Sequence, residues 1–505
     1  MFHAAQSGAH DDEWESEGRA KCRCFRLSGV SVALFFSLMT MCIGLSLYVL
    51  SLHKQRETSS LDSHAVLHVE TMTVDAMRAY WLKLVSILIP TTEILIPDLP
   101  VYKALQWMVL RDPLRPFSDE TRIRQRFTLS VLYFSWSGPS WALPEGSGWL
   151  GEAWKNVSLF NECSWEGIEC DVEGNVIGIE LDDELFPLGG GTIPTQLGHL
   201  TALQTLSLAR QGLRGKIPSE MAQLESLVTL NLPSNRLSGI DLSTVPMDTL
   251  ELLRVSDNLI KGRLDFELLR KASNLRTLEL NQNKDLEGNV LSIISNFTLL
   301  ESVDFSATSL EGTIPEDIGS LTNLKIFILQ SKDPSHLPTS IARCTSLEQF
   351  ISVQPDRDAG LVGGLPSEIG GLTNLQVLDI RQNFKLGSTI PTELGLLTSL
   401  VRVDLKRSNL QGTLPTELGE LSNLEVLTVE MNPITGTVPT EYGRLTNLEF
   451  LQIVGTAVTG DMPQEICEID INRLVASCKG YTGNVGPQAQ FSCDCCTECI
   501  FGALP

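Results

Sequence analysis

Apolar residues recur along the second half of the chain in a repeated unit. The stretch 400–423 reads LVRVDLKRSNLQGTLPTELGELSN, the stretch 424–447 reads LEVLTVEMNPITGTVPTEYGRLTN, and the two agree at nearly every apolar position. Each begins with L-x-x-L-x-L, which places alternate apolar residues on one side of a short strand. One copy cannot bury that side alone, so several copies must stack. The pattern therefore predicts a solenoid whose strands form a parallel sheet over a continuous core.

We call one copy of this unit a rung and count rungs by their first apolar residue. Twelve such positions occur, 23 to 28 residues apart. They are Val176, Leu203, Leu227, Leu250, Leu275, Leu300, Leu324, Leu347, Leu375, Leu400, Leu424 and Leu448. The motif and its period are those of a leucine-rich repeat (LRR). The predicted fold class is α/β: an LRR solenoid of about 12 rungs, with a parallel sheet on its concave face and disulfide-capped ends.

The residue that follows L-x-x-L-x-L-x-x is usually able to form hydrogen bonds. The series is Asn235, Asn258, Asn283, Asn383 and Asn432, with Thr308, Ser408 and Thr456 as hydroxyl substitutes. An inward Asn in each rung can satisfy turn backbone groups that would otherwise be buried without partners. Glu184, Gln211 and Lys332 stand at this position in other rungs, and we expect them to interrupt the series.

Two further features vary between rungs. Five rungs contain L-x-G-x-I/L/V-P, as at 410–415 and 434–439, and its proline suits the start of a helix. The rung that begins at Leu347 is 28 residues long and holds the polar insert 354–360, and the rung before it carries KDPSH at 332–336. Insertions in solenoids form loops on one face, which is often the binding face.

The chain before the repeats contains a long uncharged stretch. Ser28 to Leu52 has no charge in 25 residues, which is long enough to cross a bilayer. Four Lys or Arg residues precede it, against Lys54 and Arg56 after it, so the N-terminus is expected in the cytosol and the rest outside. We predict a single-pass type II protein of the plasma membrane, with the lumen of an endomembrane compartment as the alternative.

This topology divides the chain into six parts. They are a disordered cytoplasmic tail (1–26), a transmembrane signal-anchor helix (27–52), a juxtamembrane stalk (53–120), an N-terminal cap (121–175), the repeats (176–470) and a cysteine-rich C-terminal cap (471–505). Within the first cap, 122–138 is expected to form an amphipathic helix. Cys22 and Cys24 are lipidation candidates, and two reduced cytosolic thiols are an equal alternative.

Nine of the 12 cysteines follow the uncharged stretch, which indicates an oxidising compartment. Cys163 and Cys170 flank Trp165 and are expected to close a short disulfide loop. Cys467 with Cys478 is a plausible second pair. The remaining four, Cys493, Cys495, Cys496 and Cys499, are expected to form two more pairs, in a connectivity that the sequence does not determine.

Two alternatives and one exception accompany these pairs. A zinc site or a metallothionein-like cluster at the C-terminus is the alternative to disulfides, but thiolate metal sites are less suited to the outside of the cell. Cys344 stands at a repeat position where leucine is usual, so we expect a buried free thiol.

Asn156 and Asn296 begin N-x-S/T motifs and are candidate glycosylation sites, if the topology places them outside the cytosol.

Charge and motif content exclude some classes of function. The net charge of −23 argues against nucleic-acid binding, which needs a basic footprint. The seven His are scattered, and no HExxH, GxSxG or P-loop motif occurs. We therefore expect no enzymatic activity, no cofactor and no metal.

The candidate ligand-binding residues are charged side chains on the strand face of two adjacent rungs. They are Asp379, Arg381, Arg402, Asp404, Lys406 and Arg407. Arg381 and Lys406 occupy equivalent positions, so they should lie about 5 Å apart across the sheet. In an acidic chain this is a local basic patch. The alternative is a solvated face on which the Asp and the Arg or Lys side chains neutralise one another.

These motifs together resemble those of plant-type LRR receptor ectodomains. The resemblance rests on the L-x-G-x-I-P element and on the W-x-G-I-x-C cap of Trp165, Gly167, Ile168 and Cys170. YKALQW at 102–107, FTLSVLYFSWSG at 127–138 and SCDCCTEC at 492–499 are most similar to the kinase-less, signal-anchored LRR proteins of diatoms. The resemblance implies recognition at the cell surface. The basic patch is similar to the basic pairs by which some plant LRR receptors hold a peptide carboxylate. Arg suits this role because its planar guanidinium can bind a carboxylate through two hydrogen bonds.

The resemblance covers roughly residues 100–500 and is specific for fold more than for function. Plant receptors of this type usually carry a cytoplasmic kinase after their repeats, whereas here the expected cytoplasmic tail is 1–26. We therefore expect a receptor-like protein or co-receptor without its own kinase. Its expected partners are an extracellular peptide, protein or glycan, and a membrane protein with an intracellular effector domain. A structural or adhesive protein of the cell wall or matrix is the alternative, and an inhibitor of secreted hydrolases is a weaker one.

Overall fold

The computed structural model describes residues 79–80, 83–84, 88, 99–112, 119–137, 149–150, 161–182, 190–354, 356–478 and 491–500. The chain divides into two units, Met1–Leu82 and Lys83–Pro505, and the elements below belong to the second. The expected cytoplasmic tail with Cys22 and Cys24, the expected membrane anchor, Asn156 and Glu184 lie outside the described residues. None of the helices in the described ranges combines the length and the apolarity that a membrane crossing needs.

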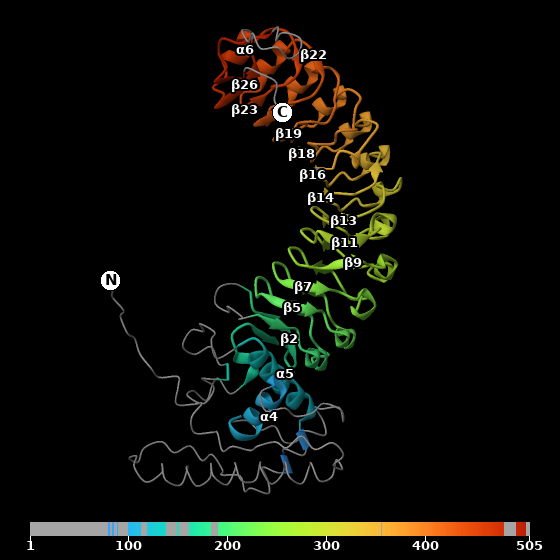
Figure 1. Ribbon diagram of the computed structural model, residues 1–505, viewed down its shortest axis with the longest axis vertical. Helices are drawn as coiled ribbons and strands as arrows, with labels where there is room; N and C mark the ends of the chain where they lie inside the picture. Colours follow the sequence, from blue (N-terminus) through green and yellow to red (C-terminus); the bar gives the residue numbers. More distant parts are fainter. Residues whose placement is uncertain are drawn as a thin grey trace, which may run out of the picture. The chain divides into compact units, whose positions relative to one another are not determined.

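A single large sheet runs through the second unit, and within that unit Figure 1 shows it along the inner side of a curved stack of rungs. The sheet has fifteen strands among the described residues, all parallel to their neighbours except the first. In spatial order they are β1 (Ile168–Cys170), β2 (Val176–Glu180), β4 (Thr205–Ser207), β6 (Thr229–Asn231), β8 (Leu252–Arg254), β10 (Thr277–Glu279), β12 (Ser302–Asp304), β14 (Ile326–Leu329), β16 (Gln349–Ser352), β18 (Val377–Asp379), β19 (Arg402–Asp404), β21 (Val426–Thr428), β23 (Phe450–Gln452), β26 (Arg473–Ser477) and β28 (Glu498–Ile500). The twelve strands from β2 to β23 lie at the expected rung starts, and β26 and β28 extend the sheet into the C-terminal cap.

In most rungs a second, shorter strand follows the strand of the large sheet, and these shorter strands form smaller parallel sheets. These are β3 (Gly191–Thr192), β5 (Leu213–Lys216) and β7 (Arg236–Gly239); β9 (Lys261–Arg263), β11 (Asp285–Gly288) and β13 (Ser309–Leu310); β15 (Pro334–Ser335) and β17 (Gly360–Leu361); β20 (Gly412–Thr413), β22 (Ile434–Gly436) and β24 (Ala457–Val458); and β25 (Gly460–Asp461) and β27 (Phe491–Ser492). The pair β15–β17 joins the two inserted segments, because KDPSH contains β15 and the insert at 354–360 ends in β17. The described residues of the inserts therefore lie outside the strands of the large sheet, and Pro334, Ser335 and Gly360 lie in this small one.

The outer side of the stack carries a short helix in each rung (Figure 1). The 3₁₀ helices are η4 (Thr195–His199), η5 (Ser219–Gln223), η6 (Leu242–Thr244), η7 (Phe266–Lys271), η8 (Leu291–Asn296), η9 (Ile318–Ser320), η10 (Thr339–Arg343), η11 (Ser367–Gly371), η12 (Thr392–Leu396), η13 (Thr416–Glu420) and η14 (Thr440–Arg444), and α6 (Gln464–Cys467) follows them. A proline precedes η4, η5 and η10 to η14, as its fixed φ favours. In η6 and η7 the side chains of Asp241 and Asp265 instead accept a hydrogen bond from the first turn.

The core is a column of inward apolar side chains. In the rung of β19, Leu400, Val403, Leu405 and Leu410 are all fully buried. Phe327 and Phe350 occupy the same position in neighbouring rungs, and their rings stack with centroids 5.7 Å apart. Residues between the inward positions are polar or only half-buried, as the period of two in the strand pattern predicts.

The expected Asn series is present as a ladder of hydrogen bonds between rungs. The Asn432 amide donates to the carbonyls of Leu405 at 2.8 Å and Val429 at 2.9 Å, and its Oδ1 accepts from the backbone N–H groups of Ser408 and Leu410, both at 3.0 Å. Asn235, Asn258, Asn283 and Asn383 each donate in the same way to a carbonyl of the preceding rung. One buried side chain thus joins the turns of two rungs.

Gln211 was expected to interrupt this ladder, and that expectation is wrong. Its side chain is buried and its Nε2 donates to the carbonyls of Leu181, at 2.6 Å, and Ala209, at 2.9 Å. The longer amide side chain therefore makes the same inter-rung bond as Asn. At Lys332, which is exposed, the preceding Ser331 is the buried residue, and its hydroxyl donates to the carbonyl of Gly312.

The N-terminal cap is built on a buried arginine. Its helix α5 (Glu120–Ser135) packs against α4 (Pro100–Leu110), which belongs to the predicted stalk. The helix expected at 122–138 thus starts and ends slightly earlier than predicted. Arg126 of α5 is fully buried and pairs with Asp112, at 2.5 Å and 2.7 Å, and with Glu162, at 2.7 Å. Its guanidinium also lies 5.5 Å from the ring centroids of Trp107 and Trp165. These contacts hold α4, α5 and the segment before β1 together.

Disulfides close both caps. Cys163, in the 3₁₀ helix η3 (Glu162–Ser164), is bonded to Cys170 in β1, which pairs antiparallel with β2. At the other end the expected pair of Cys467 with Cys478 is wrong, and so is the expectation of two pairs within the last four cysteines. The bonds are Cys467–Cys495, Cys478–Cys499 and Cys493–Cys496. The reason is that Cys467 lies in α6, beside η14, whereas Cys478 follows β26 in the large sheet, next to Cys499 in β28.

Cys344 is a free thiol with a fully buried side chain, as expected from its leucine position. Burial raises the pKa of the thiol to about 11. The thiol therefore stays protonated at neutral pH and packs as a small apolar group.

The Asn ladder generates a test of stability. Asn432→Ala removes the inter-rung bonds and leaves two backbone N–H groups and three carbonyls buried without these partners. We expect a loss of about 2–4 kcal/mol in unfolding free energy, since each buried unsatisfied group costs about 1–3 kcal/mol and water relieves part of it. Hydrogen exchange of the rungs at 400–456, together with thermal unfolding, measures the loss.

Asn423→Ala is the matched control, because Asn423 is exposed and its amide donates only to the Thr398 carbonyl on the surface. This control should change the unfolding free energy by less than about 0.5 kcal/mol. Equal losses in the two variants would contradict a structural role for the ladder.

Candidate functional site

The six candidate residues lie on two neighbouring strands of the large sheet and on the turns that follow them. Asp379 ends β18 and Asp404 ends β19, and the pairing register places these two carboxylates side by side. Arg402 begins β19, while Arg381, Lys406 and Arg407 follow the strands. All six therefore belong to one surface, as the repeat spacing predicts.

The carboxylates are buried, while the cations are partly exposed. Asp379 and Asp404 are each 5% exposed, whereas the side chains of Arg381 and Arg402 are 42% and 40% exposed. Arg381 lies 3.3 Å from Asp379 and 3.8 Å from Asp404, and Arg402 lies 3.1 Å from Asp404. The two arginines therefore stand over a pair of acids on the strand face.

Lys406 has a different partner from Arg381. Its Nζ lies 2.7 Å from Oε2 of Glu430, a residue that is 4% exposed in the next rung. Sequence reasoning missed Glu430, although it stands at the same repeat position as Arg381 and Lys406, one rung further on. That shared position was the signal that could have found it. The two basic residues expected to act as a pair are thus held by separate acids.

Arg407 differs from the other three cations. Its backbone φ is +56°, in the left-handed region, and its half-buried side chain has an Nε with no hydrogen-bond partner among the described residues. Four cations and three carboxylates on this surface leave one positive charge in a chain whose net charge is −23. The surface is thus locally basic and largely paired within itself.

The pKa of the Asp379 carboxyl depends on its burial and on the charged groups around it. Burial raises the pKa of the Asp379 carboxyl, and the neighbouring Asp404 raises it further, while Arg381 and Arg402 act in the opposite direction. The cations therefore offset part of the rise in pKa that burial and Asp404 cause.

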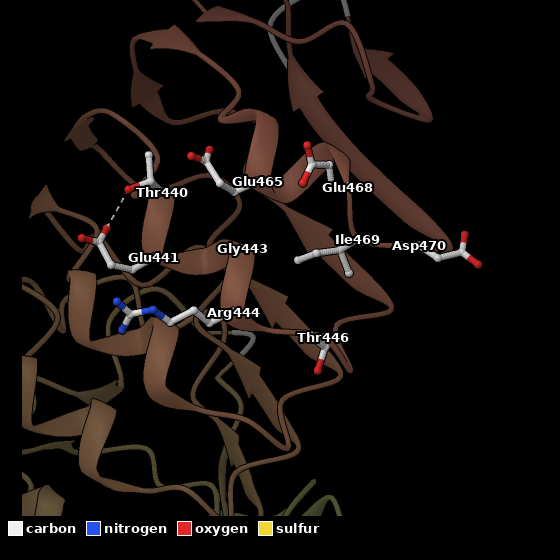
Figure 2. A pocket seen from close by; sticks show the side chains of 9 residues that line it. All are labelled: Thr440, Glu441, Gly443, Arg444, Thr446, Glu465, Glu468, Ile469 and Asp470. Atoms are coloured by element: carbon white, nitrogen blue, oxygen red, sulfur yellow. Dashed lines mark hydrogen bonds between the residues drawn. The ribbon is translucent and has the colours of Figure 1, made fainter.

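A hollow of about 580 Å³ lies elsewhere, on the outer side of the stack (Figure 2). Residues of η14, α6 and the segment after α6 line it, among them Glu441, Glu465, Glu468 and Asp470. Arg444, the cation in its lining, forms an ion pair with Glu420. Figure 2 shows the carboxylates spread around the rim without a shared focus, and none of the candidate residues is among the lining residues.

The described glycosylation candidate is accessible. Asn296 is exposed at the end of η8, and its amide donates to the Ile293 carbonyl at 2.7 Å. Phe297, the middle residue of the motif, is fully buried. Whether a glycan is attached stays a prediction for both Asn296 and Asn156.

Comparisons with known proteins find plant receptor proteins. No protein-family model matches the chain. The chain is 31% identical over 269 residues to the receptor-like protein kinase BRI1-like 3 of Arabidopsis thaliana, a match that covers 51% of this chain and 22% of that protein. It is 30% identical over 181 residues to the putative receptor-like protein 8 of the same plant, covering 34% and 17%. The chain thus matches less than a quarter of the length of either relative.

Solved structures with a similar fold include plant receptors with LRR ectodomains. One is the Arabidopsis receptor kinase HAESA in complex with the peptide hormone IDA and the co-receptor SERK1, with a TM-score of 0.58, 25% identity, and coverage of 69% of this chain and 57% of that chain. Another is the plant peptide hormone receptor RGFR1 in complex with RGF2, with a TM-score of 0.53, 26% identity, and coverage of 66% and 57%. The fold is thus the LRR fold of plant receptor ectodomains, as the resemblance predicted.

The ion pairs of the strand face generate a test of pH dependence. Arg381→Ala removes the cation nearest to Asp379, so the pKa of that carboxyl should rise further in the folded state. The variant should lose about 0.5–1 kcal/mol of unfolding free energy at pH 7, a small value because Arg381 is partly exposed. The loss should disappear as the pH falls through the folded pKa, because a protonated carboxyl needs no cation.

Chemical denaturation of the variant and the unaltered chain between pH 4 and pH 8 measures this difference. Arg236→Ala is the control, since Arg236 is exposed on β7 and forms no ion pair with another described residue. A loss that is constant over this pH range would contradict the assignment.

Proposed function

We propose that the chain is a cell-surface recognition protein whose LRR solenoid binds a peptide or a protein segment on the strand face of the large sheet. The observation that supports this most is the set of partly exposed cations on buried carboxylates at β18 and β19. A concave strand face with a fixed basic surface suits recognition, and the proposal is for binding alone.

The existing ion pairs leave hydrogen-bond donors of these cations available to a ligand. An arginine has five N–H donors, and the contacts of Arg402 with Asp404 use one terminal nitrogen. The outer part of each guanidinium is left toward solvent, since about two fifths of the side chain is exposed. A ligand carboxylate would therefore add charge-assisted hydrogen bonds to groups that are already oriented, which lowers the entropic cost of binding.

The relatives add support for the class of ligand. The HAESA and RGFR1 structures each contain a receptor ectodomain with a peptide hormone or with RGF2, and the first also contains a co-receptor. By this analogy we propose a peptide or protein ligand and a membrane partner that carries the intracellular effector. No glycan is named in these complexes, so we do not propose one.

We also propose that the protein is a single-pass, type II protein with residues beyond Leu52 outside the cell. The uncharged stretch and its basic flank support this orientation. The four disulfides among the described residues, which an oxidising compartment favours, are consistent with it.

Protease added to intact cells that express the chain with an N-terminal tag tests this orientation. We expect the repeats to be removed and a small tagged fragment, ending close to Leu52, to be protected. Permeabilised cells are the control, in which the tag itself should be cut. A full-length chain that survives on intact cells would contradict the topology.

A display library of random peptides with free carboxyl termini tests the binding proposal. The immobilised full-length chain should retain a subset of these peptides, and Arg381→Ala with Lys406→Ala should weaken the binding of that subset about tenfold or more, because charge-assisted hydrogen bonds are lost. Amidation of the carboxyl terminus should weaken binding to the unaltered chain by a similar factor.

Arg236→Ala with Lys216→Ala is the matched control, because it removes the same two charges from β7 and β5, away from the large sheet. Both doubly substituted chains should unfold at temperatures close to that of the unaltered chain. If the first variant retained the same peptides with the same affinity, the assignment of Arg381 and Lys406 would be rejected.

A further inference from the structure

An apolar area lies on the strand face beside the basic surface. We call it the aliphatic patch: Ile326 and Ile328 of β14, Ile351 of β16, Val353 directly after β16, and Val377 of β18. All five side chains are half-buried, while Phe327 and Phe350 of the same strands are fully buried inside. The strand register places Ile328 beside Ile351, and Val377 beside Gln349, which is itself the neighbour of Ile326. The aliphatic side chains of the patch thus occur on three adjacent strands, with Ile328 and Ile351 side by side and Gln349 between Ile326 and Val377.

Several other rungs carry polar residues at both of these strand positions, whereas Leu252, Val426 and Phe450 occupy the first of them in β8, β21 and β23. The equivalent pairs are Thr229 and Asn231 in β6, Thr277 and Glu279 in β10, Ser302 and Asp304 in β12, and Arg402 and Asp404 in β19. The strand preference of β-branched residues is met by Thr in two of these strands, so it does not require isoleucine. Aliphatic side chains on three adjacent strands of a solvent-facing surface indicate a contact that removes them from water.

The side of the patch toward the N-terminal rungs is acidic. Asp304 of β12 is the direct neighbour of Ile328, and it forms no ion pair with another described residue. Its carboxylate accepts a hydrogen bond from the backbone N–H of Ser306 at 2.8 Å. Burial raises the pKa of this carboxyl, so a cation placed beside it would stabilise the ionised form.

The side of the patch toward the C-terminal rungs is basic. Ile351 pairs with Asp379 and Val377 pairs with Arg402, so the patch passes directly into the surface of Arg381 and Arg402. The strand face thus has an unpaired acid, an aliphatic centre and exposed cations in that order. A ligand complementary to it has a cation, an aliphatic side chain and an anion in the same order.

The dimensions of the face fit one extended chain. Four strand steps separate β12 from β19, which is about 19 Å at roughly 4.8 Å per step. An extended segment of about six residues covers that length at roughly 3.3 Å per residue. The strands are three to four residues long, so the face is only about 10 Å wide.

We propose that this face binds an extended peptide segment along the axis of the solenoid, with its carboxyl terminus at Arg381, Arg402 and Lys406, an aliphatic side chain on the aliphatic patch, and a basic group at Asp304. The aliphatic residue lies three or four residues before the carboxylate, and the basic group about six residues before it. This inference rests on the proposed function and specifies the ligand class of the same surface.

A library of eight-residue synthetic peptides with free carboxyl termini, applied to the immobilised full-length chain, tests this order. The retained peptides should be enriched in Leu, Ile or Val three to four residues before the carboxylate, and in Lys or Arg about six residues before it. The synthetic consensus of the retained peptides then serves as the probe for the variants.

Ile328→Thr with Ile351→Thr should weaken binding of this probe about tenfold or more, because the apolar contact is lost while the strand preference is kept. Leu252→Thr is the matched control, since Leu252 is a half-buried aliphatic residue on the same face, three strands away on β8. It should change the affinity less than twofold. Thermal unfolding of all three chains checks that the substituted chains are folded.

Asp304→Lys tests the other end of the segment. This variant should prefer a probe with Glu at the distal position over one with Lys there, whereas the unaltered chain should prefer Lys. Asp304→Asn should remove the preference without inverting it, and it covers the case in which the lysine variant fails to fold.

The outcomes separate the two proposals. If binding depends on Arg381 and Lys406 but not on Ile328 and Ile351, and no aliphatic or basic enrichment is found, this inference is overturned and the proposed function stands. If the folded, unaltered chain retains no peptide, both are overturned.

Discussion

Hydrogen bonding between successive turns is the constraint on which this structure depends. Each rung ends its strand in a turn whose backbone groups point into the stack, where no water can reach them. The side chain of Asn432 forms hydrogen bonds with five such groups, two N–H groups and three carbonyls, in its own rung and the one before. An isolated rung would leave these groups unpaired and its leucines exposed, so a rung is stable only between neighbours. Ser408 shows how far the rule tolerates variation, since its hydroxyl still donates to the Ile380 carbonyl.

This constraint leaves the strand face free to vary. The core needs only the inward positions, and the turns need only one buried polar side chain in each rung. The residues between the inward positions contribute little to either, so neighbouring rungs can carry Asp304, Ile328, Ile351 and Asp379 in one row without disturbing the stack. Binding specificity in a solenoid is therefore determined by residues at positions that core packing and turn hydrogen bonds do not require. For the same reason a comparison that establishes the LRR fold does not establish the ligand.

The repeat can be recognised in the sequence because the alternation of apolar residues within a strand and the spacing between first leucines both involve residues close together in the chain. The spacing of first leucines predicts the strands from β2 to β23, and the same spacing assigns the inward Asn positions. It does not predict the C-terminal disulfides, because they depend on which elements end side by side. β28 lacks the L-x-x-L-x-L pattern, so nothing in the sequence indicates that it continues the sheet beside β26 and brings Cys499 to Cys478. The wrong expectation for Gln211 has a related cause: its residue type differs from Asn, but its amide donates to the same carbonyl position of the preceding rung.

The candidate site is predictable in position but not in its pairing. Repeat spacing places Arg381, Lys406 and Glu430 in one row, yet which cation meets which acid depends on side-chain conformations that spacing does not determine. Burying Asp379 and Asp404 costs desolvation energy, and surface pairs of this kind return little stability. A fold that needed only stability would gain more from Thr or Val at these strand positions, residues that other rungs carry there. What the buried acids do provide is a fixed orientation for cations that remain partly exposed, and that is a property of use to a bound anion rather than to the stack.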